Sequence, residues 1–399
     1  MDDMTLKNTP SKKEPRKRFF PSALLLFLLL VLAVILFNHE SITGFANVAA
    51  LDYVEPLVTI TVNENALEPL HIKTPEAVKA VYMSSWVAGS PKYRDRLVHL
   101  IDTTELNAVV VDVKDSTGII SFEMKDPLVK SIGAFENRIP DVKALIKELH
   151  EKNIYVIARI AVFQDPYITK LKPEWAVETK AGKIWKDRKG LSWANMASKD
   201  FWDYTVAIAR ETYRTGFDEL NFDYVRFPSD GNMNDIAYPG FDESKVSKSE
   251  QLRRFFEYLS DSLKLSHAPL SVDLFGMTTT NTDDLNIGQV LENALPYFDY
   301  IAPMVYPSHY PPTFNGWKKP ATVPYELIKF VMEEGVKRVV AASSTPNKLR
   351  PWLQDFDLGA VYTGSMVREQ IQATYDVGLN SWMLWDASNK YTPSALENK

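Results

Sequence analysis

The sequence contains no cysteine in 399 residues. This absence excludes structural disulfides, cysteine-ligated zinc, iron–sulfur clusters and thiol catalysis. Histidine is scarce as well, with 6 residues, and none of them has the spacing of a zinc hydrolase motif. We therefore expect no cofactor and no metal. Calcium bound by Asp283, Asp284 and Asn286 is the remaining alternative, although these residues lack the EF-hand spacing.

Several motifs and one kind of charge are also missing. Neither GxGxxG nor GxxxxGK occurs, so a phosphate-binding glycine loop is not indicated. No GxSxG elbow is present to support Ser-His-Asp chemistry. Lys and Arg (45) do not outnumber Asp and Glu (51), and the net charge of −6 argues against nucleic acid as the main partner.

One long apolar run is present, at residues 19–37, and it carries no charge. As a helix it would span about 28 Å, close to the hydrocarbon thickness of a bilayer. Residues 1–18 carry six basic and three acidic side chains, which favour a cytoplasmic position for this end. The run predicts a transmembrane signal anchor, and a cleaved signal peptide with a secreted mature form is the alternative. Either way, the chain after residue 38 is expected outside the cytoplasm.

These features divide the chain into four predicted parts. They are a basic cytoplasmic tail (1–18), a transmembrane anchor (19–37), an extracellular stalk (38–75) and a single large domain (76–399). After the tail, 39 basic side chains face 48 acidic ones. This acidic balance favours a neutral or cationic polymer over an anionic one as the partner of the domain.

Short runs rich in Val, Ile, Tyr and Phe alternate with amphipathic stretches throughout the large domain. The strand-like runs are residues 79–87, 108–115, 154–163, 219–227, 270–277, 299–306, 350–356 and 381–388. The helix-like stretches are residues 91–105, 139–152, 199–216, 247–266, 284–298, 323–342 and 364–378. Eight such strands predict a (β/α)8 TIM barrel preceded by an N-terminal transmembrane helix. A doubly wound open sheet is the rival fold, but it would normally carry a glycine-rich turn.

Polar and aromatic side chains gather at the ends of these strands. The candidate site residues are Trp86, Asp112, Lys114, Asp115, Arg159, Asp223, Tyr224, Arg226, Asp273, Tyr306, His309, Trp352, Asp355, Trp385 and Asp386. The carboxyl ends of barrel strands meet at one face, which carries the catalytic site of this fold. The long segment 164–198 also follows a strand, so we expect it to cover that face as a lid or substrate wall. Carboxylates with arginine and aromatic rings are typical of glycoside cleavage.

Five blocks of the sequence resemble a bacterial family of glycosyl hydrolase barrels, which is distantly similar to α-amylase-type glycosidases. The blocks are residues 158–166, 219–231, 299–310, 350–356 and 382–391, and the resemblance covers about residues 76–392. It implies a nucleophile at Asp223, an acid/base residue at Asp273 and a sugar-steadying carboxylate at Asp355. Two departures stand out. Asp273 replaces the usual Glu, and Arg226 follows Asp223 by three residues instead of preceding it by two.

We expect Asp223 to stay ionised near Arg226 or Lys114. Strand alternation points Arg226 towards the helices, and the alternative is that Arg226 bends back where the strand ends at Pro228. Asp273 is the expected proton donor, with a pKa raised by apolar neighbours such as Phe275. Asp112 and Asp115 are competing donors, and Arg159 and Tyr306 are expected to contact sugar hydroxyls or an acidic sugar group. The remaining candidates are assigned to substrate binding.

The predicted function is a membrane-anchored extracellular glycoside hydrolase that cleaves a poly- or oligosaccharide with a carboxylate pair. The alternative is a non-catalytic carbohydrate-binding barrel at the cell surface. The sequence leaves the oligomeric state open.

Overall fold

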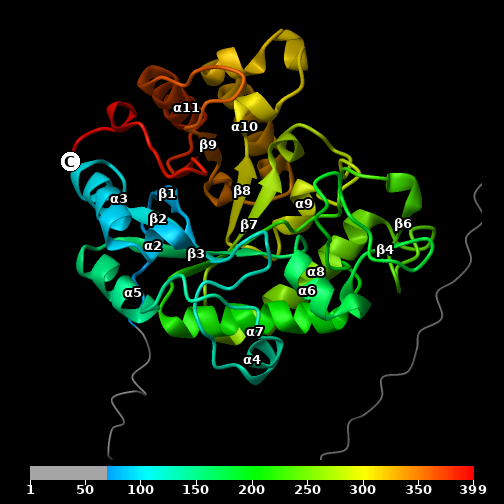
Figure 1. The fold of residues 1–399 in the computed structure, drawn as a ribbon. Helices are drawn as coiled ribbons and strands as arrows, with labels where there is room; N and C mark the ends of the chain where they lie inside the picture. Colours follow the sequence, from blue (N-terminus) through cyan, green and yellow to red (C-terminus); the bar gives the residue numbers. More distant parts are fainter. Residues whose placement is uncertain (1–69) are drawn as a thin grey trace, which may run out of the picture. The chain divides into compact units, whose positions relative to one another are not determined.

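Eight parallel strands close into a barrel within residues 70–399, the part of the chain that the computed structural model describes (Figure 1). The strands are β1 (Lys79–Met83), β2 (Ala108–Lys114), β3 (Tyr155–Ala161), β5 (Glu219–Asp223), β7 (Leu270–Phe275), β8 (Tyr300–Met304), β9 (Trp352–Gln354) and β10 (Trp382–Trp385). Their order around the barrel is β1-β10-β9-β8-β7-β5-β3-β2. Each predicted run contains one of these strands, so the predicted TIM barrel is confirmed.

The helices lie around the outside of the strands (Figure 1). They are α2 (Ser85–Ala88), α3 (Pro91–Thr103), α4 (Pro127–Ile132), α5 (Val142–Glu151), α6 (Pro166–Leu171), α7 (Lys199–Thr215), α8 (Lys248–Leu263), α9 (Leu291–Ala294), α10 (Pro324–Ala341) and α11 (Gly364–Asp376). Serine caps begin the two long helices α7 and α8. The side chains of Ser198 and Ser247 accept the N–H of Phe201 and Glu250, respectively.

The predicted helix over residues 284–298 is wrong, because only the four residues of α9 are helical there. Leu285 and Asn286 have φ angles of 52° and 58°, and Gly288 has a φ of 82°. A side chain at Gly288 would also lie 2.9 Å from the carbonyl oxygen of Lys248. The chain therefore turns through this stretch before it becomes helical.

Both faces of each barrel strand are covered, which explains the nearly continuous apolar runs. Along β2, Val109 and Val111 pack in the large outer cluster, whereas Ala108 and Val110 belong to a smaller cluster inside the barrel. The same alternation directs Asp112 to the interior. Polar side chains at the carboxyl ends of the strands are thereby brought to the barrel mouth.

The segment 164–198 forms a substructure of its own beside the barrel. Its strand β4 (Glu178–Thr179) pairs antiparallel with β6 (Ile236–Ala237). The three tryptophans of the segment, Trp175, Trp185 and Trp193, are 7%, 2% and 1% exposed. Their main role is therefore to pack this segment against the domain.

The predicted tail and anchor, and most of the predicted stalk, lie outside the described residues. Within residues 70–399, no helix is both long enough and apolar enough to cross a bilayer. The first described residues join the amino-terminal end of the barrel, where the Ile72 N–H donates to the Asp218 carboxylate at 2.7 Å.

Candidate active site

A cavity of about 270 Å³ opens at the carboxyl ends of the barrel strands. It is lined by Arg159, Asp223, Tyr224, Arg226, Asp273, Phe275, Gln289, Met304, Tyr306, His309, Trp352 and Trp385. Most of these are residues that the sequence singles out. The cavity is the place where carboxylates, arginines and aromatic rings meet.

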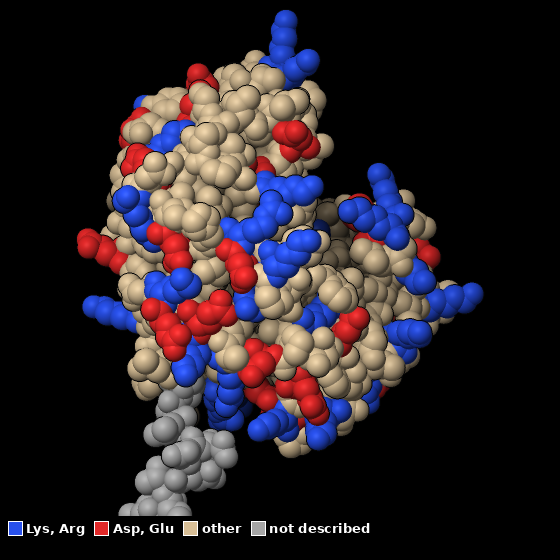
Figure 2. All heavy atoms as spheres, turned by 60° about the vertical axis from the view of Figure 1, so that its left-hand side comes forward, with Lys and Arg blue, Asp and Glu red and all other residues tan. Residues whose placement is uncertain are grey.

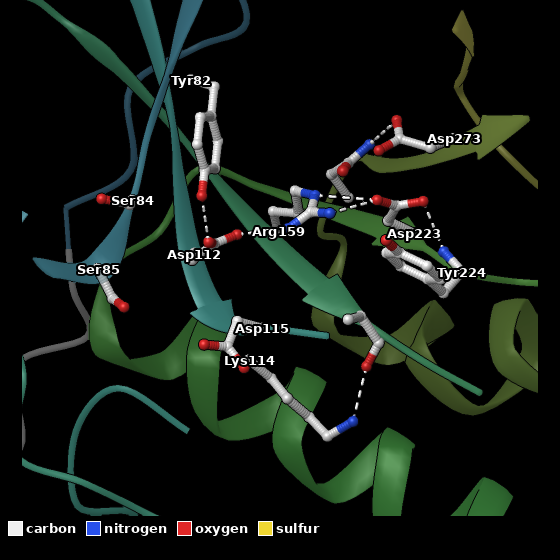
Figure 3. A network of polar contacts seen from close by, with 12 residues as sticks. Tyr82, Ser84, Ser85, Asp112, Lys114, Asp115, Arg159, Asp223, Tyr224 and Asp273 are labelled. Atoms are coloured by element: carbon white, nitrogen blue, oxygen red, sulfur yellow. Dashed lines mark hydrogen bonds and ion pairs between the residues drawn. The ribbon is translucent and has the colours of Figure 1, made fainter. Parts of the chain in front are cut away.

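Arg159 joins two carboxylates at the inner face of the barrel (Figure 3). Its Nη1 donates to Asp112 Oδ1 at 2.6 Å, and its Nε donates to Asp223 Oδ2 at 3.1 Å. The Nη2 group contacts the same Asp223 oxygen. Tyr82 donates its hydroxyl to Asp112 Oδ2 at 2.5 Å. The cation beside Asp223 therefore comes from the neighbouring strand β3, and the predicted pairing with Arg226 or Lys114 is wrong.

The backbone bends sharply directly after Asp223. Tyr224 has a φ of 53°, a conformation that costs a residue other than glycine about 1–3 kcal/mol. Its N–H donates to Asp223 Oδ1 at 2.6 Å, which fixes the carboxylate at the end of β5. Because the bend ends the strand, Asp223, Tyr224 and Arg226 all line the cavity. Of the two predicted positions, Arg226 therefore takes the one bent back towards the barrel mouth, and it does not point towards the helices.

Asp273 lies on β7, is 1% exposed, and has only neutral hydrogen-bond donors. Asn221 Nδ2 and Trp352 Nε1 both donate to its Oδ1, at 2.9 and 2.8 Å. Burial, together with the negative charge of Asp223, raises the pKa of Asp273 to about 8. A raised pKa is the condition on which the sequence makes Asp273 the proton donor. Its causes are burial of the carboxyl group and the charge of Asp223.

Lys114 does not reach the cavity, and its predicted substrate contact is wrong. A β-bulge between Asp112 and Lys114 places Lys114 opposite Ile160 of β3. Its ammonium group pairs with Asp165 at 2.8 Å and donates to the Ala161 carbonyl at 2.7 Å. Lys114 thus links β2 to the start of α6, below the outer surface of the barrel.

Five further candidates lie outside the cavity lining. Asp112 is covered by Arg159, as described above. Asp115 pairs with Arg138 at 2.5 Å, and Asp386 accepts the N–H groups of its own loop. Asp355 accepts the N–H and hydroxyl of Thr392 at 2.9 and 2.7 Å. Trp86 lies on α2, 59% exposed, with the Arg138 guanidinium 4.8 Å from its ring.

The proposed calcium ligands are engaged in a turn. Asp283 and Asp284 accept the backbone N–H groups of Leu285 and Asn286, respectively. Across the described part of the chain, no group of three or more His, Asp and Glu side chains could hold a metal ion.

The match with known proteins decides the family. Residues 80–391 match the family described as "Putative glycosyl hydrolase domain". The chain belongs to this family. No curated protein matches it significantly.

Two solved structures with TM-scores of 0.50 or more show the same fold. The glycoside hydrolase domain of PgaB (BpsB) from Bordetella bronchiseptica has a TM-score of 0.57 at 14% identity, over 78% of this chain and 94% of that chain. The α-galactosidase TtGalA from Thermus thermophilus has a TM-score of 0.50 at 10% identity, over 82% and 61%. A hypothetical protein from Ruminiclostridium thermocellum ATCC 27405 is 34% identical over 52% of this chain and 98% of that chain, with a TM-score of 0.45. Membership of this family confirms the predicted glycoside hydrolase.

The sequence reasoning does not single out several residues of the site. Gln289 clamps two strand ends, since its Oε1 accepts the Phe275 N–H at 2.8 Å and its Nε2 donates to the Val225 carbonyl at 3.2 Å. It follows the glycine turn inside a stretch that reads as a helix, so no pattern indicates it. Asn221 and Tyr82 could have been found, because alternation along β5 and β1 directs both side chains inward.

The buried pair of Lys114 and Asp165 should be a stability determinant of this glycosyl hydrolase. We expect Lys114→Ala to lower the free energy of unfolding by about 3–5 kcal/mol, because it leaves the Asp165 carboxylate buried without a cation. Urea denaturation measures the change, with the exposed Lys143→Ala as control. A stable Lys114→Ala variant that has lost activity would instead indicate a direct role at the site.

Asp355 should have a smaller effect than the cavity carboxylates. Burial raises its pKa to about 6, and both of its oxygens are held by Thr392. We expect Asp355→Asn to lower kcat/KM by no more than about tenfold, through a loss of about 1 kcal/mol of loop anchoring. Steady-state kinetics check this, and a loss as large as that of Asp223→Asn would show that Asp355 acts on the substrate.

Proposed function

We propose that the chain is a membrane-anchored extracellular glycoside hydrolase that cleaves a poly- or oligosaccharide, with Asp223 and Asp273 as its catalytic pair. The observation that carries the proposal is the contrast between two carboxyl groups in one cavity. Asp223 is held by a guanidinium group, whereas Asp273 is buried among neutral donors. A carboxyl group paired with a cation suits the role of nucleophile or base, and one buried among neutral donors suits the role of acid.

The proposed reaction divides the work between the two groups. Asp223, held by Arg159, attacks the anomeric carbon or takes a proton from water. Asp273 keeps its proton at neutral pH and gives it to the oxygen of the departing sugar. Its Oδ1 already accepts two N–H groups, so Oδ2 is the oxygen that carries the proton.

The remaining lining suits a sugar ring. Tyr306, Trp352 and Trp385 provide apolar and aromatic surface against which a pyranose can pack. Burial lowers the pKa of His309, which keeps its imidazole neutral and able to bond a hydroxyl group at pH 7.

The location rests on the sequence. The charge-free run 19–37 and the basic residues before it support an anchor whose amino-terminal side is cytoplasmic. Protease treatment of intact cells tests this, because it should degrade the barrel while the tail remains with the membrane. Release of the whole domain into the medium would favour the secreted form.

Hydrolysis is tested by incubating the purified full chain with a panel of polysaccharides, including amino-sugar polymers, and measuring new reducing ends. We expect wild-type activity on at least one member and none from Asp223→Asn. Retention of a polysaccharide without turnover would support the alternative, a carbohydrate-binding barrel.

A further inference from the structure

Arg226 lines the cavity without a carboxylate partner. Its Nη1 donates to the Phe227 carbonyl at 3.1 Å and to Ser229 Oγ at 3.3 Å. Within residues 70–399, no Asp or Glu oxygen lies within 4.0 Å of its guanidinium, unlike that of Arg159. Within the described residues its Nε and Nη2 have no hydrogen-bond acceptor, and neither atom is among the fully buried atoms that lack a partner, so both are available to a ligand.

The guanidinium is nevertheless held in a fixed position. It lies 4.7 Å from the centre of the Trp193 ring and 5.8 Å from that of Tyr224. Trp193 is itself fixed, because its Nε1 donates to Asp187 Oδ2 at 3.2 Å. A stacked arginine with one anchored edge and one free edge is preorganised for an oxyanion, which accepts two parallel N–H groups.

Trp193 follows an arm of the chain, residues 178–190, that is strongly basic. Between Glu178 and Gly190 it has five basic and two acidic side chains, in a chain whose net charge is −6. The five exposed cations are Lys180, Lys183, Lys186, Arg188 and Lys189. None of them has an ion-pair partner in the described part of the protein. The acidic Asp187 is occupied, since its Oδ1 accepts the N–H groups of Lys189 and Leu191.

Exposed like charges without partners repel one another, and an anionic polymer would relieve that repulsion. Trp193 connects this arm to the cavity, with Arg226 over its ring and Asp187 at its Nε1. Figure 2 shows Lys and Arg side chains, with Asp and Glu among them, on both sides of a hollow. The arm is thus positively charged, although the chain as a whole is negatively charged. The expectation of a neutral or cationic polymer depends on the negative overall charge.

We infer that the substrate is an anionic glycan, with Arg226 binding a carboxylate or phosphate group next to the bond that is cleaved. The cations of the arm (residues 178–190) attract the polymer towards the cavity. This inference rests on the hydrolase function proposed above and specifies the substrate class of the same site.

Binding by full-chain Asp223→Asn, which holds the substrate without cleaving it, tests the inference. The probes are oligosaccharides in four matched groups: uronates, their carboxyl-reduced forms, phosphate-bearing glycans and amino-sugar glycans. We expect binding to uronates or to phosphate-bearing glycans, which identifies the anionic group. Adding Arg226→Gln should weaken that binding about 10- to 100-fold, and Arg226→Lys should restore part of it. Preference for reduced or amino-sugar forms, or no effect of Arg226→Gln, would overturn the inference.

The arm is tested separately with Lys186→Glu/Lys189→Glu. This exposed pair should slow association at low salt, and the defect should shrink as ionic strength rises. The matched control is Lys143→Glu/Lys147→Glu on α5, which should leave association unchanged. Asp223-dependent cleavage of a neutral glycan would remove this inference and leave the proposed hydrolysis intact. Binding of an anionic glycan without any cleavage would contradict the proposed hydrolysis and leave the assignment of an anionic ligand intact.

Discussion

Asp223→Asn should lower kcat/KM for glycan hydrolysis by about 100- to 10,000-fold. The amide has the size of the carboxylate but has neither its charge nor its basicity. It can therefore neither attack the anomeric carbon nor take a proton from water. The fold should survive, because Arg159 keeps its bond to Asp112 at 2.6 Å and the Tyr224 N–H keeps an oxygen acceptor. Reducing-end kinetics measure the loss, and thermal unfolding checks the fold.

The matched control is Asp115→Asn. Asp115 also lies after a barrel strand, but it pairs with Arg138 and accepts the Thr117 N–H, and it is outside the cavity lining. We expect its activity to stay within about threefold of the wild type, because Asp115 does not line the cavity. Equal losses of activity in the two variants would show that the carboxylates at this face act through protein stability or through the overall electrostatic potential. They would then not act on the bond that is cleaved.

The strands were predictable because barrel strands are buried on both faces. A run such as 108–115 must be apolar almost throughout, and little else in a globular chain produces eight such runs at regular spacing. The helix over 284–298 failed for a local reason. Its apolar periodicity is helical, but the positive φ angles at Leu285, Asn286 and Gly288 depend on packing against neighbouring segments.

The site was predictable as a region but not in its pairings. Alternation along a strand indicates which side chains face inward, and it locates Asp112, Arg159 and Asp273. It fails where the backbone departs from a regular strand. The bulge before Lys114 and the bend at Tyr224 each change the face of the strand on which the following basic side chain lies. These side chains are Lys114 and Arg226, respectively. Neither irregularity is marked by a glycine or a proline at its own position in the sequence.

The network around Arg159 explains why two aspartates in one cavity differ in chemistry. Arg159 is shared by Asp112 and Asp223, which leaves Asp273 with amide and indole donors only. Two ionised carboxylates side by side in a buried site repel each other, so the one without the cation holds its proton. In the proposed mechanism, the strand that supplies the arginine therefore determines which aspartate is the acid and which is the base.

Asp273→Asn should abolish the alkaline limb of the pH–rate profile and slow hydrolysis of natural glycosides by about 100- to 10,000-fold. In the wild type, activity should fall as pH rises through about 8, because Asp273 loses the proton that the leaving oxygen needs. Aryl glycosides with a strongly acidic leaving group need no such proton, so the variant should retain much more activity on them. Rates from pH 5 to 10 on both substrate classes measure the effect.

A second readout separates this role from a general loss of structure. In the folded protein burial raises the pKa of Asp273 from its ordinary value of 3.8 to about 8. Its contribution to stability is therefore complete below about pH 4 and is lost as pH rises through about 8. Asp273→Asn should flatten the dependence of the unfolding free energy on pH between about pH 4 and pH 8. Asp223→Asn, in contrast, should slow the hydrolysis of natural glycosides and of aryl glycosides alike. If Asp273→Asn instead slowed both classes equally and kept the alkaline limb, the proton donor would be another group, and Asp273 would only position Trp352 and Asn221.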